Sequence, residues 1–306
     1  MDPFRDLLDH QSGVVARRQL IGLGWSDNDI RREVRNRRLA TVRRGVFVNH
    51  TGPLTWANRA WAGVLFHEGS ALCGPSALNL SGDPIHVAVS AGRSVTLLDG
   101  VVVTRMKGLE DKVLWNRSPP RLRIEEAALD VAGDARSTSE AVAVITDVCG
   151  RRATTPERLL VALSARQRTP RGVELRRVLA HAAEGTRSVL ERDYLLRVER
   201  RHGLPRGRRQ ATDRLDTGAI VHRDVSYDEW GVVIELDGAL WHGSAQARTN
   251  DMTRDLASAA NGLVTLRVGW RHVWDEACLT ADRIARVLCN RGWSGRPRSC
   301  GRACRL

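Results

Sequence analysis

The sequence predicts a mixed α/β chain (α+β overall), and the order of its segments indicates three domains and a tail. Residues 1–50 read as short helices followed by a basic two-stranded segment, the pattern of an N-terminal winged helix-turn-helix. Residues 51–172 alternate strand-like and helical runs, which predicts a mixed α/β middle domain. Residues 173–291 contain a strong helix and apolar, β-branched runs, which predict an αβ core, and residues 292–306 predict a basic flexible tail.

The length of the chain indicates how many domains it has, and its charge indicates which kind of partner it binds. A chain of 306 residues suits two or three domains with proper cores. The net charge of +13 and the pI near 10.8 favour a polyanionic partner, nucleic acid first. Lys107 and Lys112 are the only lysines, so arginine supplies nearly all of the positive charge. A solubility charge and the arginine bias of a GC-rich genome are the alternative explanations.

We expect a cytoplasmic protein that does not enter a membrane, because no stretch approaches the length of a membrane span and the first residues do not resemble a signal peptide. The six cysteines show no disulfide-like framework, which fits a reducing compartment. Cys300 and Cys304 lack the paired spacing and the histidines of a zinc site, so we expect none there.

The first fifty residues predict a DNA-binding module. Ser26 is placed to cap a third helix that runs through Asn36. The other elements are expected as a first helix at 4–8, a second at 15–21, and wing strands at 39–42 and 46–48. Candidate DNA contacts lie on the third helix and the wing: Arg31, Arg32, Arg35, Arg43 and Arg44. The alternative is a small helical domain with a solvated arginine face.

Three segments of this module, residues 13–20, 30–34 and 43–48, resemble the N-terminal domain of AbiEi-type antitoxins, the transcription-repressing half of type IV toxin–antitoxin systems. The resemblance implies DNA binding and a possible protein partner of the toxin–antitoxin type. It does not carry over an operator or a particular toxin.

The middle region predicts a domain without catalytic residues. Helices are expected at 56–66, 75–80, 125–131, 139–149 and 156–163, and strands at 85–89 and 101–104. Its polar residues are isolated along the chain, so we expect it to serve in positioning or partner contact.

A β-hairpin is predicted in the last domain, with strands at 219–226 and 232–237. Because successive side chains of a strand point to opposite faces, Val232, Ile234 and Leu236 share one face, and Val233, Glu235 and Asp237 share the other. The first face is expected to be core and the second to be chemical.

A turn centred on Asp228 and Glu229 would set Asp224 opposite Val233 and His222 opposite Glu235. His222, Asp224, Glu235 and Asp237 would then face the same side. Asp224 would be a diagonal neighbour of Glu235, at roughly 7–8 Å, and two carboxylates at that separation can close around one divalent cation.

Further candidates flank the hairpin. Glu191 lies on a helix expected at 186–202, at the edge of its buried face, where a solvated carboxylate is an equally good interpretation. A loop at 200–210 carries Arg206, Arg208 and Arg209, which suit phosphate contacts. A helix at 246–260 carries Arg254, a further candidate DNA contact, and is followed by a strand at 263–268 and a last helix at 280–290.

Three acids followed by His242 in an arginine-rich protein indicate metal-dependent cleavage of a phosphodiester. A hard divalent cation takes oxygen ligands and lowers the pKa of a bound water, so Asp224, Glu235 and Asp237 are the candidate ligands. His242 is then the candidate general acid or base, since its reference pKa lies near neutrality.

The order of elements over residues 186–290 is similar to the restriction-endonuclease-like PD-(D/E)XK core, with Glu191 on the helix, Asp224 on one strand and Glu235 and Asp237 on the next. Asp224, the run 232–238 and Trp241-His242 more closely resemble the very-short-patch-repair (Vsr-like) endonucleases and a related bacterial family of unknown function. That resemblance implies Mg²⁺ (or Mn²⁺) held by an acid at Asp224, chemistry assisted by His242, and a match at Arg254-Asp255.

The chain departs from the PD-(D/E)XK pattern where Glu-x-Lys is expected, because it has Glu235-Leu236-Asp237 and no lysine in this domain. Arginine is a poor substitute as a base because it stays protonated. Vsr-like enzymes also dispense with this lysine, which leaves more of the chemistry to His242. Their structural zinc site has no counterpart that the sequence reveals, so mismatch specificity is not carried over.

Three functions remain open on the sequence. The first is a metal-dependent DNA endonuclease targeted by its N-terminal domain. The others are a DNA-binding regulator whose nuclease fold is inactive and an antitoxin-like protein that acts through protein contacts. The complete acidic trio favours the enzyme, since a decayed site would be expected to lose at least one acid. The choice among duplex, single-stranded or modified DNA and RNA stays open.

Overall fold

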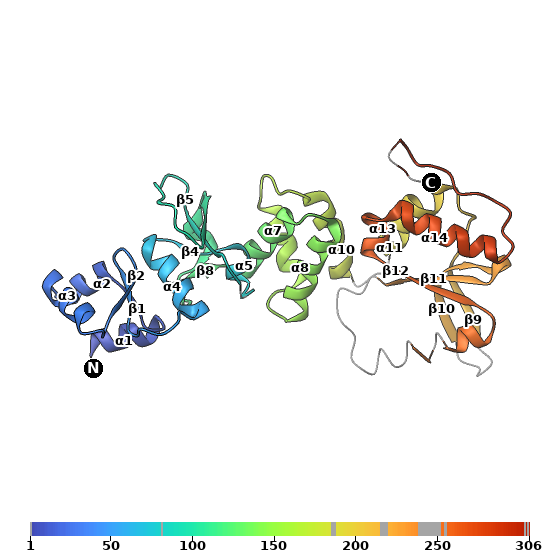
Figure 1. Cartoon of the computed structure of the whole chain (residues 1–306). Helices are drawn as coiled ribbons and strands as arrows, with labels where there is room; N and C mark the ends of the chain where they lie inside the picture. The colour runs from blue at the N-terminus through green and yellow to red at the C-terminus, as the bar shows by residue number, and fades with distance from the viewer. Residues whose placement is uncertain are drawn as a thin grey trace. The chain divides into compact units, whose positions relative to one another are not determined.

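The computed structural model describes residues 2–80, 82–184, 188–214, 220–237, 252–253, 256–302, 304 and 306. It is a mixed α/β structure with three separate sheets (Figure 1). The chain divides into two compact units, residues 1–131 and 132–306. Within the described part, no helix is both long and apolar enough to cross a bilayer.

The first unit begins with three helices and a small sheet. Its elements are α1 (Pro3–His10), β1 (Val14–Ala16), α2 (Arg17–Gly22), α3 (Asp27–Arg35), β2 (Ala40–Arg43) and β3 (Val46–Val48). The strands pair antiparallel in the order β1-β3-β2. The third helix and the two wing strands therefore lie close to where the sequence predicts them.

The expected helix at 15–21 is wrong at its start, because Val14–Ala16 is a strand. Val14 and Val15 pair with Val48 and Phe47, and both valines are fully buried. Val14 packs in a cluster with Trp61, whereas Val15 packs in another cluster on the opposite face of the strand. A segment buried on two faces suits β-branched residues in a strand better than one stripe of a helix.

Ser26 caps α3 as its sequence position predicts. Its Oγ accepts a hydrogen bond from the Asp29 backbone N–H at 3.2 Å, and Asp29 Oδ2 accepts from the Ser26 backbone N–H at 2.9 Å. We expect Ser26→Ala to lower the free energy of unfolding of the first unit by about 1 kcal/mol, because the Asp29 backbone N–H loses its acceptor. Urea unfolding measures this loss. Asn28→Ala, an exposed change on the same helix, is the control, and an equal loss in both variants would contradict the cap.

The rest of the first unit is a five-stranded sheet with short helices. Its elements are α4 (Trp56–Phe66), β4 (Ala71–Leu72), α5 (Gly74–Ala77), β5 (Ile85–Ser90), β6 (Val101–Met106), α6 (Leu109–Lys112), β7 (Val113–Leu114) and β8 (Arg121–Leu122). The strand order is β6-β5-β4-β8-β7, with β5 and β6 parallel. The predicted helix at 56–66 is confirmed at both ends.

Helices lead into the second unit and strands follow them. The helices are α7 (Ile124–Asp134), which crosses the unit boundary, then α8 (Thr138–Gly150), α9 (Pro156–Ser164), α10 (Gly172–Glu184), α11 (Ser188–Asp193) and the π-helix η1 (Tyr194–Arg200). The later elements are β9 (Arg208–Arg214), β10 (Ile220–Tyr227), the 3₁₀ turn η2 (Asp228–Trp230), β11 (Val232–Asp237), β12 (Val264–Gly269), α13 (Trp270–Trp274) and α14 (Ala277–Asn290). Residues 256–260 are also helical and end at a turn through Gly262, as expected.

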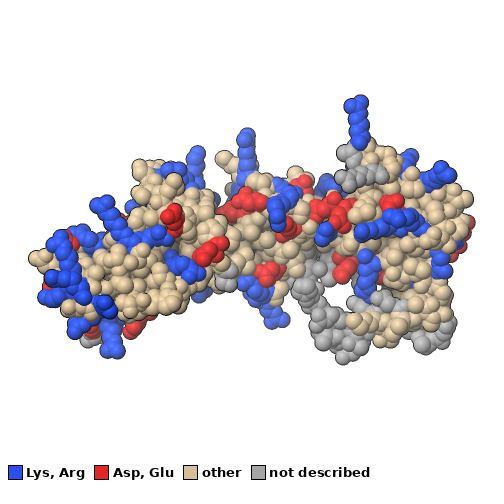
Figure 2. Space-filling model, viewed as in Figure 1, with Lys and Arg blue, Asp and Glu red and all other residues tan. Residues whose placement is uncertain are grey.

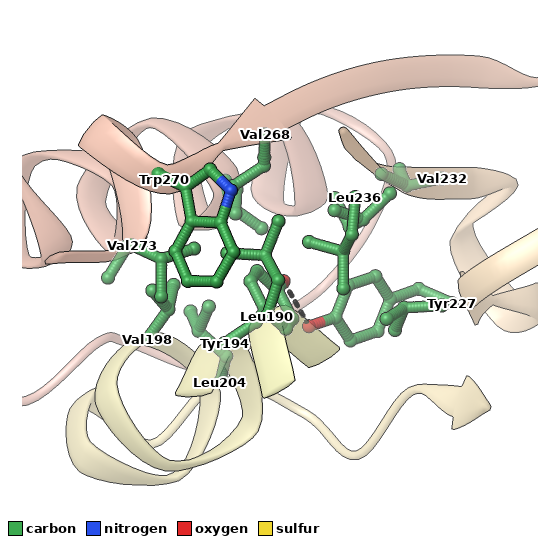
Figure 3. Packing of buried hydrophobic residues seen from close by; sticks show 14 of the residues in the cluster. Leu190, Tyr194, Val198, Leu204, Tyr227, Val232, Leu236, Val268, Trp270 and Val273 are labelled. Atoms are coloured by element: carbon green, nitrogen blue, oxygen red, sulfur yellow. Dashed lines mark hydrogen bonds between the residues drawn. The ribbon is translucent and has the colours of Figure 1, made fainter. Parts of the chain in front are cut away.

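The sheet of the second unit has the order β12-β11-β10-β9. Strands β9, β10 and β11 pair antiparallel, whereas β11 and β12 are parallel. One face of this sheet packs against η1 and α13 through Tyr194, Tyr227, Leu236 and Trp270 (Figure 3). The predicted core face of β11 lies in this cluster, together with most of the apolar face of α14.

The segment after residue 291 packs on the second unit, which differs from the flexible tail that the sequence predicts. Trp293 and Leu306 lie against the apolar cluster of the sheet. The Arg298 backbone N–H donates a hydrogen bond to the His202 carbonyl at 2.8 Å. The tail is therefore attached at the end of η1 and at the core.

Candidate functional site

The predicted hairpin forms, but its register is two residues away from the expected one. Ser226, not Asp224, lies opposite Val233, and Val225 lies opposite Ile234. The turn is η2 followed by Gly231 in the left-handed region at φ 61°, and Tyr227 pairs with Val232 across it, so the centre of the turn lies between Glu229 and Trp230, one residue later than predicted. Extending this register by one residue sets Asp224 level with Glu235. Because the predicted and observed registers differ by an even number of residues, Asp224, Glu235 and Asp237 still lie on the same face of the sheet.

Asp224 is the most buried of these acids, with 2% of its surface exposed. Its Oδ2 accepts a hydrogen bond from the Leu236 backbone N–H at 2.7 Å. The carboxylate therefore holds a main-chain donor of β11 just beyond the last paired residues, Val225 and Ile234. Burial of a carboxylate costs free energy unless hydrogen bonds or a cation compensate for it, so the hydrogen bond from Leu236 is needed to hold Asp224 at this position.

Glu235 and Asp237 lie on the same face, and solvent exposure increases from Asp224 through Glu235 to Asp237. Glu235 is half-buried and Asp237 is exposed at the end of β11. The parallel register with β12 places Arg267 beside Glu235 and Gly269 beside Asp237. We refer to this side of the sheet, defined by Asp224, Glu235 and Asp237, as the acidic face.

The acidic face does not hold a ready-made cluster of ligands. Among the residues that the structure describes, four side chains lie close enough to share one ion, and none of them belongs to the acidic face. They are His202, Cys278, Cys300 and Cys304. His222, which was expected on this face, is exposed, and its Nδ1 lies 3.3 Å from Thr212 Oγ1 on β9.

Glu191 is bound to a residue of the edge strand. Gln210 Nε2 donates to Glu191 Oε1 at 2.6 Å. The register of β9 and β10 pairs Arg223 with Ala211 and Val225 with Arg209, so Gln210 lies level with Asp224. Gln210 thus stands between Glu191 and the acidic face.

Trp241, His242 and Arg254 lie outside the described residues, and so does the motif end Asp255. The predictions for His242 as general acid or base and for Arg254 as a DNA contact stay predictions.

The arginines of the first unit are mostly solvent-exposed. Arg31, Arg35 and Arg44 are exposed, and Arg31 also donates to Asn28 Oδ1 at 3.1 Å. Basic side chains gather over α2 and α3 on the face seen in Figure 2. Two more of the predicted contacts also have partners within the unit: Arg32 forms ion pairs with Asp29 and Glu33, and Arg43 donates to the Asp99 carbonyl.

The end of the predicted phosphate-binding loop, residues 208–210, belongs to strand β9, and two of the loop's arginines bind carboxylates. Arg208 pairs with Asp228 at 2.7 Å, which lowers the pKa of Asp228. Arg209 pairs with the buried Glu199 at 2.7 Å. Arg206 lies before the strand and is exposed. Of the three, Arg206 is the one best placed for an external phosphate.

Glu199 is the centre of a buried polar network that the sequence did not reveal. Its Oε2 accepts from Tyr227 at 3.1 Å and from the Gly207 backbone N–H at 3.3 Å, in addition to Arg209. The Tyr194 and Tyr227 hydroxyls meet at 3.0 Å, as the dashed line in Figure 3 shows. Burial raises the pKa of both tyrosines.

A second cluster brings the two tail cysteines together with a histidine and a third cysteine, a grouping that the sequence did not lead us to expect. His202, Cys278, Cys300 and Cys304 each offer one ligand atom, and these atoms all lie within 4.8 Å of one another. We call this group the HisCys₃ cluster. Spacing within the tail does not show this grouping, because the histidine follows η1 and the third cysteine lies on α14.

No protein-family model and no curated protein matches the chain. Function is therefore inferred from the fold and from the side chains that it brings together.

Proposed function

We propose that the second unit is a metal-dependent endodeoxyribonuclease of the PD-(D/E)XK type and that the first unit holds DNA through a winged helix. The observation that carries this proposal is the acidic face. Asp224 and Glu235 are the next residues beyond the last paired residues of adjacent strands, Val225 and Ile234, and Asp237 follows at the open end of the same face. Carboxylates in such a row repel a phosphodiester unless a cation neutralises them, so the arrangement indicates a metal site.

The donor set of the acidic face fits Mg²⁺ or Mn²⁺, because both ions prefer carboxylate oxygens. Asp224 and Glu235 would hold the ion, with Asp237 as the third ligand. When bound, such an ion polarises a phosphoryl group and lowers the pKa of a coordinated water. The proposal requires the side chains of Glu235 and Asp237 to rotate toward Asp224 on binding, since Asp224 is fixed by the Leu236 N–H.

The alternation of helices and strands in the first unit supports its proposed role. A winged helix places one helix in the major groove and its wing along the backbone. Here the corresponding helix is α3, which presents Arg31 and Arg35 to solvent, and the wing is formed by β2 and β3, with the exposed Arg44 between them.

We expect Arg31→Ala and Arg35→Ala each to weaken binding to duplex DNA and to reduce the slope of log affinity against log salt by about 1, because each removes one phosphate contact. Fluorescence anisotropy across a salt series measures both quantities. Arg5→Ala, an exposed arginine on α1, is the matched control. A double variant of α3 with the slope of the wild type would contradict the winged-helix assignment.

The proposed reaction is tested with the purified full chain on supercoiled plasmid, linear duplex, single-stranded DNA and RNA. Each substrate is incubated with Mg²⁺, Mn²⁺ or excess EDTA. We expect nicking or cutting of at least one DNA substrate with either ion and none with EDTA. Cleavage of RNA alone would correct the substrate class while keeping the site.

A second candidate function is a DNA-binding regulator, or an antitoxin-like protein with a toxin-type partner, whose nuclease fold is inactive. The observation that favours it is the engagement of Asp224 with the Leu236 backbone, which gives this acid a structural role without any metal. DNA binding without cleavage of any substrate would support this candidate.

A further inference from the structure

The HisCys₃ cluster shares no residue with the acidic face and brings together three separate parts of the second unit. His202 follows η1, Cys278 lies in the first turn of α14, and Cys300 and Cys304 belong to the tail. The sulfur atoms of Cys278 and Cys300 are 3.6 Å apart. Two sulfurs that are each about 2.3 Å from one zinc ion at a tetrahedral angle lie roughly 3.8 Å apart, so this spacing suits a shared ion.

His202 supplies the strongest single indication of a ligand. Its side chain is fully buried, and its Nδ1 lies 3.1 Å from the Val198 carbonyl oxygen. A carbonyl only accepts, so Nδ1 carries the proton and Nε2 of the neutral ring carries a lone pair. Nε2 is buried and has no hydrogen-bond partner among the residues that the structure describes. A buried polar atom without a partner is costly, and coordination of a metal removes that cost.

The hydrogen bond from Nδ1 to Val198 is also what a metal-ligating histidine needs. Such histidines usually donate their second ring nitrogen to a carbonyl or carboxylate, which fixes the ring and its tautomer. Here the carbonyl belongs to the preceding turn of the same helical segment. The ring is therefore oriented before any ion arrives.

Local contacts hold the tail cysteines near His202. The Arg298 backbone N–H donates to the His202 carbonyl at 2.8 Å, and the Arg298 side chain donates to the Arg200 carbonyl at 2.9 Å. The Cys304 backbone N–H donates to the Gly301 carbonyl at 2.9 Å, which closes a turn between the two cysteines. All six cysteines are free thiols, so no disulfide competes for these sulfurs.

We propose that the HisCys₃ cluster binds one structural Zn²⁺ ion that fastens the tail to η1 and α14. Three thiolates and one imidazole form a closed tetrahedral set, which is the pattern of structural rather than catalytic zinc. Soft sulfur ligands select zinc over the Mg²⁺ and Mn²⁺ proposed for the acidic face. The inference does not depend on nuclease activity, because none of its ligands belongs to that face.

The test measures zinc in the full chain, purified under reducing conditions and dialysed against metal-free buffer. Inductively coupled plasma mass spectrometry is expected to find one zinc per chain in the wild type. Cys304→Ser is expected to lose this zinc, and Cys278→Ser should behave in the same way. Replacement of zinc by Co²⁺ should give the intense visible absorption of a tetrahedral cobalt–thiolate site, which reports on geometry independently of stability.

Cys289→Ser is the matched control, because Cys289 lies on the same helix as Cys278, is exposed and is outside the cluster. It is expected to keep one zinc per chain. Circular dichroism establishes that each variant is folded. Wild-type protein without zinc after growth in zinc-replete medium would overturn the proposal, as would a folded Cys304→Ser variant with the full complement. A Cys278–Cys300 disulfide in the native protein would also overturn it.

Discussion

Replacement of Asp237 by asparagine is expected to reduce metal-dependent DNA cleavage by at least about 100-fold, because a lost metal ligand removes several kcal/mol of transition-state stabilisation. Asp237 is exposed at the end of β11, so the change leaves the core cluster of β11 intact. DNA affinity should stay at the wild-type value, since the proposed DNA-binding arginines are elsewhere. Single-turnover cleavage and anisotropy measure the two effects separately.

Glu229→Gln is the matched control for Asp237→Asn. Glu229 is an exposed acid in η2, between the same two strands, and lies outside the acidic face. Its replacement also removes one negative charge, so a general electrostatic effect on DNA would change both variants alike. Equal cleavage rates for Asp237→Asn and Glu229→Gln would exclude Asp237 from the site.

Replacement of Glu199 by alanine is expected to lower the free energy of unfolding of the second unit by about 3–5 kcal/mol, the usual cost of breaking a buried ion pair. Glu199 is 2% exposed and accepts hydrogen bonds from Arg209, Tyr227 and Gly207. Its removal leaves the Arg209 charge and the Tyr227 hydroxyl without this acceptor. Hydrogen exchange in urea, measured on peptides of β10 and β11, reports the loss for this unit alone.

The ion pair between Arg208 and Asp228 provides the comparison for Glu199. Both side chains are about half exposed, at 47% and 52%, although their atoms approach to 2.7 Å. Exposed pairs contribute only about 0–1 kcal/mol, so Arg208→Ala should change unfolding little. A loss in Glu199→Ala no larger than in Arg208→Ala would show that the buried network is not a main source of stability.

The face pattern of the central strand was predictable, whereas its register was not. Alternation alone separates Val232, Ile234 and Leu236 from Glu235 and Asp237, because the period of a strand is two. The register depends on the turn, and the 3₁₀ turn through Trp230 is centred one residue later than a turn centred on Asp228 and Glu229, which changes each cross-strand pairing by two residues. Turn geometry of this kind has no strong signal in Asp228-Glu229-Trp230.

The edge strand β9 shows how tertiary contacts override local preference. Its sequence is polar and arginine-rich, which indicates a loop. In the structure it pairs with β10, and the carboxylates of Glu199 and Asp228 neutralise Arg209 and Arg208. Strand preference depends on such neighbours, and these come from segments outside β9.

The spacing of cysteines and histidines in the sequence does not predict the HisCys₃ cluster, because its ligands come from separate segments. Its ligands come from the end of η1, the start of α14 and two positions in the tail, so only the packing of the tail brings them together. Short cysteine motifs are informative when the ligands are neighbours in sequence, and here only Cys300 and Cys304 are.

Conversion of supercoiled plasmid to nicked or linear DNA tests the central claim most directly. With Mg²⁺ or Mn²⁺, the wild type and Glu229→Gln are expected to convert the plasmid, whereas Asp237→Asn and the wild type in EDTA are expected to leave it supercoiled. Wild-type protein that binds the plasmid and leaves it intact with both ions would contradict the nuclease. Conversion by Asp237→Asn at the wild-type rate would contradict the acidic face as its site.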